Sequence, residues 1–331
     1  MVTVAVQIDS IAFDRILKAV KARKYASPHD FMVAAAWNQL ALDDMTEPTA
    51  VSQHRATEAS TADAGQSRPL PAVDLDAAGF AEVPPLDDQR RVLWGQVNRV
   101  FPIALGLRAL GHLTLTHPDG VPVELWHEDA TNGAIGLRAR LKQWDEEAGR
   151  VPGMRWAIGM PEATPESRHR YMNQFLGIPK PSGIADGACL FLGLAVARQT
   201  PEGTLVLPSA EGARWAGLTN PVLDSGDGVP RSTFSDPEVE FYVHHLERYR
   251  TAESNFMRAV GGLVAQGHSR EELDSAIAES FPEMSHVSST MRAGVLGRMS
   301  DLGLVERVRS GSKVEYRLTS LAIRFGFGSQ V

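Results

Sequence analysis

The sequence contains a single cysteine, Cys189, among 331 residues. One cysteine excludes an intramolecular disulfide framework and any metal site built from several thiolates. Cys189 lies in the apolar run ACLFLGLAV, which favours a packed core thiol over a catalytic nucleophile. Scarce cysteine is also typical of a reducing cytoplasm, and this is the location that we expect.

Long apolar runs are absent as well. No stretch approaches the roughly 18 apolar residues that a membrane-spanning helix requires. The N-terminal sequence MVTVAVQIDSIAFDR lacks the basic start and the small-residue cleavage site of a secretory signal. We therefore expect a cytoplasmic protein without a membrane partner.

Positive charge is in short supply: 33 Lys and Arg oppose 40 Asp and Glu, for a formal net charge of −7. The isoelectric point calculated from the sequence is 5.8. This balance excludes a uniformly basic nucleic-acid binder, so any such role requires a local basic patch.

Motifs that carry catalysis are missing too. The sequence has no phosphate-binding P-loop, no nucleophile elbow and no dinucleotide-binding glycine pattern. Glu124, Glu128, Arg140 and Lys142 have no spacing specific to a nuclease. We therefore predict a protein that is not an enzyme, with no catalytic residues and no cofactor.

Histidine positions offer no metal site. His127 lies beside two acids, but Thr131 stands where a second zinc ligand of an H-E-x-x-H pattern would be needed. A surface histidine in an acidic loop is the favoured interpretation. The adjacent His244 and His245 cannot both face one metal from a helix, so we predict a solvated helix there and no metal ligands.

The first 44 residues have a pattern of their own. Val4, Val6 and Ile8 alternate with polar or small residues, which predicts a strand, and two helical segments follow. Ser27-Pro28 supplies an N-cap and a proline at the first position of the second helix. A unit of about 45 residues cannot bury a core alone, so we expect it to form a homodimer.

This segment, with KYASPHDFMVAAAWNQLALDD as its second helix, resembles the ribbon-helix-helix family. The resemblance implies a two-chain ribbon whose outward side chains read the DNA major groove. Those side chains would be Thr3, Ala5 and Gln7, and among them only Gln7 is a good base reader. A dimerisation arm and a DNA-contacting ribbon both stay open.

Residues 45–90 are rich in Thr, Ser, Ala, Asp, Glu, Gln and Pro, which predicts a flexible linker. Residues 91–233 regain folded character as a helical central region. There LTLTHPDGVPVELW predicts two short strands around a Pro-Asp-Gly turn. Trp94, Asn98 and Arg99 form a polar-aromatic group with a capping or partner-binding role.

An internal repeat links two parts of the chain. Leu192-Gly193-Leu194 matches Leu302-Gly303-Leu304, and each match precedes two strand-like segments joined by a short turn. A helix, a glycine-ended turn and a β-hairpin in this order resemble the winged helix-turn-helix family, in which the hairpin is the wing. The resemblance implies a helical, winged-helix-like central region over residues 91–233, in which 91–150 is a candidate for a third, degenerate copy.

The copy within residues 234–331 is the more complete. Three helices are predicted before its hairpin, and the second begins with a capping box from Ser269 to Glu272. Met291, Val295, Met299 and Leu302 recur at helical spacing along the third helix. Opposite them lies a face of small residues: Thr290, Ala293, Gly297 and Ser300.

Positive charge gathers in this copy. Residues 288–324 contain seven Lys and Arg against three Asp and Glu. The small face would approach a groove between flanking arginines, the helix start would donate to a phosphate, and the wing would contact the backbone. The predicted DNA-binding residues here are Ser289, Thr290, Arg292, Arg298, Arg307, Arg309, Lys313 and Arg317, with Arg324 a little beyond.

The fold class that we predict is mainly α with small β-hairpins: a ribbon-helix-helix arm, a flexible linker and a tandem winged-helix body. The predicted function is non-enzymatic binding of double-stranded DNA by a dimeric transcriptional regulator or nucleoprotein-complex component. The alternative is a protein-interaction scaffold that docks other protein subunits through its winged helices.

Overall fold

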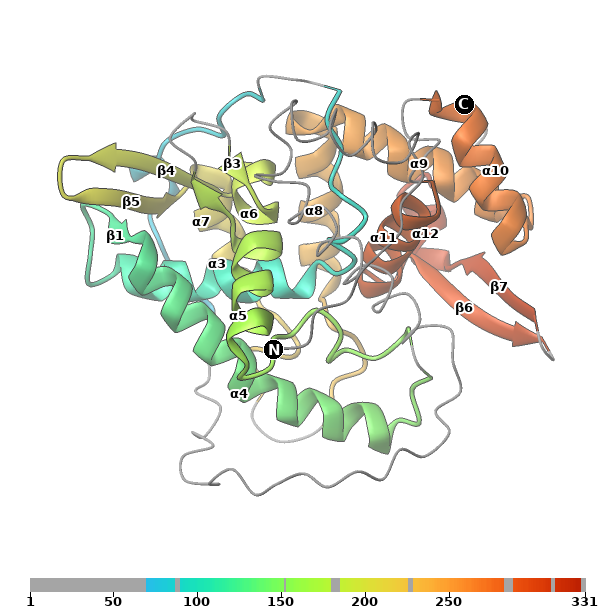
Figure 1. The fold of residues 1–331 in the computed structure, drawn as a ribbon, viewed down its shortest axis with the longest axis horizontal. Helices are drawn as coiled ribbons and strands as arrows, with labels where there is room; N and C mark the ends of the chain where they lie inside the picture. Colours follow the sequence, from blue (N-terminus) through green and yellow to red (C-terminus); the bar gives the residue numbers. More distant parts are fainter. Residues whose placement is uncertain are drawn as a thin grey trace, which may run out of the picture. The chain divides into compact units, whose positions relative to one another are not determined.

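The computed structural model describes residues 70–86, 90–151, 153–179, 185–225, 229–282, 288–310 and 313–328. The chain divides into two compact units, 1–60 and 61–331, and all described residues belong to the second. The predicted arm of residues 1–44, with Gln7, lies outside them. The described part is mainly helical and contains three small antiparallel sheets (Figure 1). None of its helices is both long and apolar enough to cross a bilayer.

The first half of the described chain builds one helix-and-hairpin module, here called the first module. Strand β1 pairs with β5, which gives a three-stranded sheet in the order β1-β5-β4. The elements are η1 (Ala77–Gly79), α3 (Phe101–Thr114), β1 (Val121–Pro122), α4 (Val123–Glu147), α5 (Pro165–Tyr171), the π-helical turn η2 (Met172–Leu176), β2 (Ile178–Pro179), β3 (Ala185–Asp186), α6 (Ala188–Leu192), β4 (Ala195–Thr200), β5 (Gly203–Pro208) and α7 (Ala210–Ala216).

The predicted hairpin around the Pro-Asp-Gly turn is wrong. Helix α3 continues through Thr114, and the only strand residues nearby, Val121 and Pro122, pair with β5 instead. Residues 91–150 are therefore no degenerate third copy: α3, β1 and α4 supply the elements that complete the first module. The physical reason is that residues 101–111 of α3 are buried on every side, a property of core helices.

Helix α3 forms the centre of the first module. Trp126 of α4 is fully buried against it and donates its indole N–H to the Gly106 carbonyl over 2.8 Å. Pro102 occupies the first turn of α3, where a missing N–H costs nothing. The proline therefore begins this helix without removing a hydrogen bond from it.

The second module follows helix α8 (Asp236–Tyr249). The helices predicted for it are present, and so is the capping box, in which the Ser269 N–H donates to Glu272 over 2.7 Å. The apolar stripe of its third helix is buried as predicted. The elements are α9 (Thr251–Ala265), α10 (Arg270–Ser280), α11 (Ser288–Asp301), β6 (Val305–Ser310), β7 (Lys313–Leu318) and α12 (Ser320–Arg324).

The two repeated segments have the same backbone geometry. Gly193 and Gly303 end α6 and α11 with φ of 71° and 69°, the left-handed conformation that favours glycine. Each hairpin consists of two six-residue antiparallel strands that are separated by two residues in the sequence. Ser209 and Thr319 then cap the short helices α7 and α12 with their hydroxyls.

Residues 70–86 do not form the predicted flexible linker. The Val73 N–H donates to the Ala216 carbonyl over 3.0 Å, and the Ala210 N–H donates to the Ala81 carbonyl over 2.8 Å. Val73 and Val83 are buried. The polar composition of this segment predicted a linker. The burial of these two valines nevertheless holds it on α7 as an extended segment.

Candidate nucleic-acid interface

Arg298 was expected to contact a phosphate and instead forms a buried ion pair. Its Nη2 lies 2.7 Å from Glu253 Oε1, and both side chains are 0% exposed. Its Nη1 donates to the Val97 carbonyl over 2.5 Å. No DNA phosphate can reach this guanidinium, so the predicted role of Arg298 is wrong.

Arg292 is likewise structural. The residue is 2% exposed, and its Nε donates to Asp274 Oδ1 of α10 over 2.6 Å. The pair ties α11 to α10 within the second module. The predicted phosphate contact by Arg292 is therefore wrong as well.

The small face of α11 receives a segment of the same chain, residues 93–100. A Cβ added to Gly95 would lie 2.1 Å from the Thr290 carbonyl oxygen, and one added to Gly294 would lie 2.4 Å from Gly95 Cα. A Cβ on Gly297 would lie 2.5 Å from the Asn98 carbonyl oxygen. The small residues thus permit close approach of protein backbone where we expected a DNA groove.

Little of α11 is left for another partner. Ser289 is the only residue of α11 that is exposed, and Thr290, Ala293 and Ser300 are half-buried. The Ser300 hydroxyl contacts the Met154 sulfur over 3.2 Å. The predicted insertion of this helix into a groove, with Ser289 and Thr290 at the groove floor, is incompatible with this packing.

Segment 93–100 is fixed at both ends by buried carboxylates of the second module. The Leu93 N–H donates to Glu253 Oε2 over 2.8 Å. The N–H groups of Val100 and Phe101 each donate to Asp301 Oδ2 over 2.7 Å. Asp301 thereby satisfies the free N–H groups at the start of α3, which lacks a side-chain cap of its own. Burial raises the pKa of Asp301.

The residues of the polar-aromatic group near Trp94 have different roles in the structure. Arg99 is buried and donates to the carbonyls of Asn98 and Gly153 over 2.7 and 2.6 Å. Burial lowers its pKa. Trp94 is 49% exposed. Arg99 is therefore structural, while Trp94 faces solvent.

The predicted DNA-contacting cations of the β6–β7 hairpin that the structure describes lie closer to solvent than Arg292 and Arg298 of α11. Arg317 is exposed, with a side-chain exposure of 59%, and lies 3.2 Å from Glu315. Arg307 is half-buried, and a Cβ on Gly153 would lie 2.7 Å from its Nη1. The side chains of Arg309 and Lys313 lie outside the described part of the chain.

The strand register places the two arginines of this hairpin whose side chains are described on opposite faces. Arg307 lies opposite Tyr316 on the neighbouring strand, and Glu306 lies opposite Arg317. Because side chains alternate along a strand, Arg307 faces one side of the hairpin and Arg317 faces the other, together with Glu306 and Glu315.

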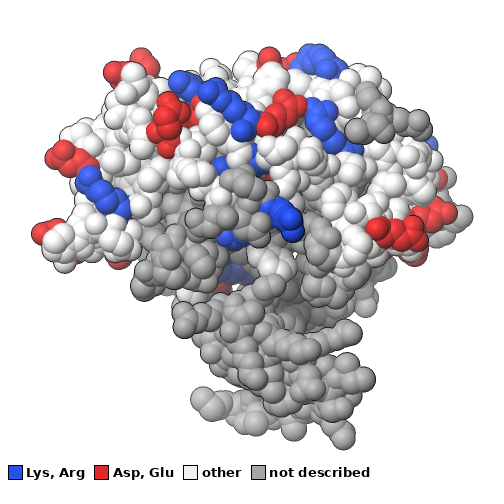
Figure 2. Space-filling model, turned by 90° about the horizontal axis from the view of Figure 1, so that it is seen from above, with Lys and Arg blue, Asp and Glu red and all other residues white. Residues whose placement is uncertain are grey.

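Charges of both signs also lie outside this hairpin. Arg324 of α12 forms an exposed ion pair with Asp236 over 2.8 Å. Figure 2 shows Lys and Arg interspersed with Asp and Glu across one face of the described residues. Such a surface creates no broad field of one sign.

The helix of the first module that corresponds to α11 is also enclosed. All residues of α6 are buried. The ring of His245 hydrogen-bonds the Leu192 carbonyl over 2.9 Å, and Arg250 Nε donates to the Phe191 carbonyl over 2.6 Å. Burial lowers the pKa of His245 to about 4 and that of Arg250 to about 10. The predicted solvated position is wrong for His245, whereas His244 is exposed.

The remaining candidate residues form no reactive site. Cys189 is buried as predicted, and burial raises the pKa of its thiol. His127 lies on helix α4, where we expected an acidic loop, and hydrogen-bonds the Gly177 carbonyl over 3.0 Å. Within the residues that the structure describes, no three His, Cys, Asp or Glu side chains are grouped to hold a metal ion.

Comparisons with known proteins add no further evidence, because no family model, curated protein or solved structure matches this sequence.

Proposed function

We propose that this chain is a non-enzymatic protein that binds double-stranded DNA through the phosphate backbone, using the β6–β7 hairpin. The observation that carries the proposal is the exposed Arg317 on a hairpin whose two six-residue strands hold three further cationic positions, 307, 309 and 313. Figure 1 shows this hairpin projecting from the helices of the second module. Residues 1–44 would pair two chains, so that each dimer presents two hairpins.

The repeated geometry supports this proposal. A helix, a left-handed glycine, a two-stranded hairpin and a capped short helix occur in both modules. This is the order of elements that resembles winged helices, whose wings contact DNA phosphates. We propose regulation of transcription or assembly of a nucleoprotein complex as the biological role.

The burial of α11 determines the mode of binding. With α6 and α11 enclosed, neither of the helices that precede a hairpin is free to read bases in a groove. Phosphate contacts position a protein but carry no direct sequence information. Binding by the body is therefore sequence-independent, and any base reading would come from Gln7 in the N-terminal arm.

Salt dependence tests the proposal. Up to four phosphate contacts predict a slope of log affinity against log salt of about −3 to −4 per body. We expect an Arg309/Lys313/Arg317 triple-alanine variant to lose most of this slope in anisotropy titrations with a labelled duplex. Arg198→Ala, on the exposed side of the β4–β5 hairpin, is the matched control and should change little.

A second candidate function has its own supporting observation. Enclosed helices and a net charge of −7 suit a scaffold that docks protein subunits. If the wild-type protein shows no affinity for duplex DNA at about 50 mM salt, where phosphate contacts are strong, the DNA proposal fails and the scaffold is favoured. Deletion of residues 1–44, followed by measurement of the molar mass in solution, tests the dimer separately.

A further inference from the structure

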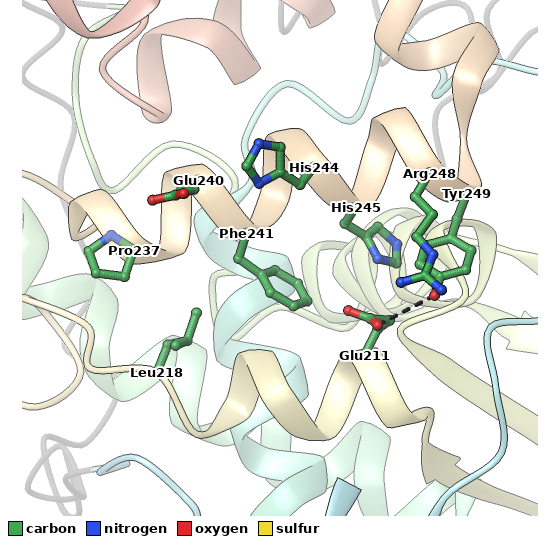
Figure 3. A pocket seen from close by; sticks show the side chains of 9 residues that line it. All are labelled: Glu211, Leu218, Pro237, Glu240, Phe241, His244, His245, Arg248 and Tyr249. Atoms are coloured by element: carbon green, nitrogen blue, oxygen red, sulfur yellow. Dashed lines mark hydrogen bonds between the residues drawn. The ribbon is translucent and has the colours of Figure 1, made fainter. Parts of the chain in front are cut away.

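Helices α7 and α8 border an open pocket of about 370 Å³. Figure 3 shows Phe241 and His245 extending from α8 toward α7, and Glu211 extending from α7 toward them. Leu218 and Pro237 complete the apolar end. The volume lies within the roughly 300–1,000 Å³ typical of small-molecule sites. The proposed DNA contact uses none of these residues.

A buried carboxylate that lines this pocket belongs to Glu211, a residue that is 7% exposed. Its Oε1 accepts a hydrogen bond from the Tyr249 hydroxyl over 3.4 Å and another from Arg214. Its Oε2 accepts no hydrogen bond from any residue in the described part of the chain. In Figure 3 this second oxygen lies on the Phe241 side of the carboxylate.

The chain's own side chains show which charge the pocket favours. Arg214 pairs with Glu211 although 53% of the Arg214 side chain is exposed. The guanidinium of Arg248 lies 5.0 Å from the centre of the Tyr249 ring, in the geometry of a cation–π contact. Both arginines are exposed, so each can withdraw into water and leave its place to another cation.

We propose that this pocket binds a small organic cation with an aromatic body. Its ammonium group would donate to Glu211 Oε2, and its ring would pack against Phe241 and Tyr249. A buried carboxylate gains most from a charged donor because water competes weakly there. This ligand site goes beyond the DNA contact and does not depend on it.

Three isosteric probes test the charge preference: phenethylamine, 2-phenylethanol and phenylacetate. They share a ring and a short arm but end in a cation, a neutral hydroxyl and an anion. We expect the full-length protein to bind phenethylamine about tenfold more tightly than 2-phenylethanol, because a charge-assisted hydrogen bond is stronger than a neutral one. Isothermal titration calorimetry would measure the affinities, and saturation-transfer NMR would detect binding too weak for it. Equal binding of all three probes, tighter binding of phenylacetate, or no binding would overturn the proposal.

Three variants locate the site. Glu211→Gln should remove the preference for the amine, whereas Glu202→Gln, in the exposed turn between β4 and β5, should leave it unchanged. Arg214→Gln should raise the affinity for phenethylamine several-fold, because it removes the competing cation. This gain cannot come from a damaged fold, so it keeps the proposal testable even if Glu211→Gln proves unstable. Loss of affinity in Arg214→Gln would contradict it.

Discussion

The two modules share a backbone but differ in the chemistry of their hairpins and helices. The β4–β5 hairpin carries one cation, Arg198, whereas the β6–β7 hairpin carries four. The corresponding helices differ in length, since α6 has five residues and α11 has fourteen. Both are nevertheless enclosed, α6 by α8 and α11 by segment 93–100. The shared geometry therefore does not make either helix a recognition element, and of the two hairpins the second carries more positive charge.

A second contrast lies within the second module itself. On α11, Arg298 neutralises the buried Glu253 and the buried Arg292 pairs with the half-buried Asp274, whereas Arg317 on β7 faces water beside an exposed partner. Buried and exposed ion pairs have different energetic weight. The following predictions use variants of the two classes of arginine and of the residues that enclose α6 and α11.

The largest effect is expected from Arg298→Ala. It leaves Glu253 charged and buried without its partner, which costs about 3–5 kcal/mol of unfolding free energy. Urea denaturation followed by circular dichroism would measure the loss. A loss below about 1 kcal/mol, the range of exposed pairs, would contradict the burial of this pair.

Gly294→Ala should rank second. Its new Cβ would lie 2.4 Å from Gly95 Cα, and such overpacking costs roughly 1–3 kcal/mol or more. The control is Gly262→Ala in α9, where an added Cβ meets nothing within 4 Å. There we expect stabilisation of about 0.5–1 kcal/mol from the better helix propensity of alanine. Equal effects in the two variants would show that segment 93–100 does not press on α11.

The dependence of stability on pH tests the enclosure of α6. Because burial lowers the pKa of His245 to about 4, the unfolded chain takes up a proton more readily than the folded chain below about pH 6.5. Stability should therefore fall as the pH falls, with His245 contributing roughly 2 kcal/mol of the loss between pH 7 and pH 5. Burial raises the pKa of Asp301 and Glu238, which acts in the opposite direction.

His245→Gln isolates the histidine term from the two carboxyl groups. The difference in stability between wild type and variant should shrink on going from pH 7 to pH 5. A constant difference across this range would show that His245 is accessible to protons in the folded state.

The smallest effect is expected from Arg317→Ala. Its partner Glu315 is itself 46% exposed, so we expect a change within about 0.5 kcal/mol in urea denaturation. Together with Arg298→Ala, this variant measures how far the two classes of arginine differ. A loss comparable to that of Arg298→Ala would remove the distinction.

Much of the second module could be predicted because its local patterns agree with its fold. The apolar stripe of α11, the capping box of α10 and the glycine-ended turns all arise from residues near one another in the chain. The role of Arg298 could have been suspected, because it lies seven residues after Met291 and three after Val295. That spacing places it on the apolar stripe, where a charge needs a buried partner.

Other features could not be predicted from local patterns. The contact of Gly95 with Gly294 joins two glycines that are distant in the sequence, and no periodicity links them. Strand β1 has only two residues and forms because β5 offers an unpaired edge. The enclosure of α11 by segment 93–100 follows from such long-range contacts. This enclosure leaves the hairpin as the candidate interface.

The most direct test compares the salt dependence of duplex affinity in two single variants. Arg317→Ala should reduce the slope of log affinity against log salt by about 0.9, the loss of one phosphate contact. Arg292→Met removes an equal charge from the interior and should leave the slope unchanged. A reduction of the slope by Arg292→Met in a folded protein, with Arg317→Ala behaving as wild type, would contradict the assignment of DNA contact to the hairpin.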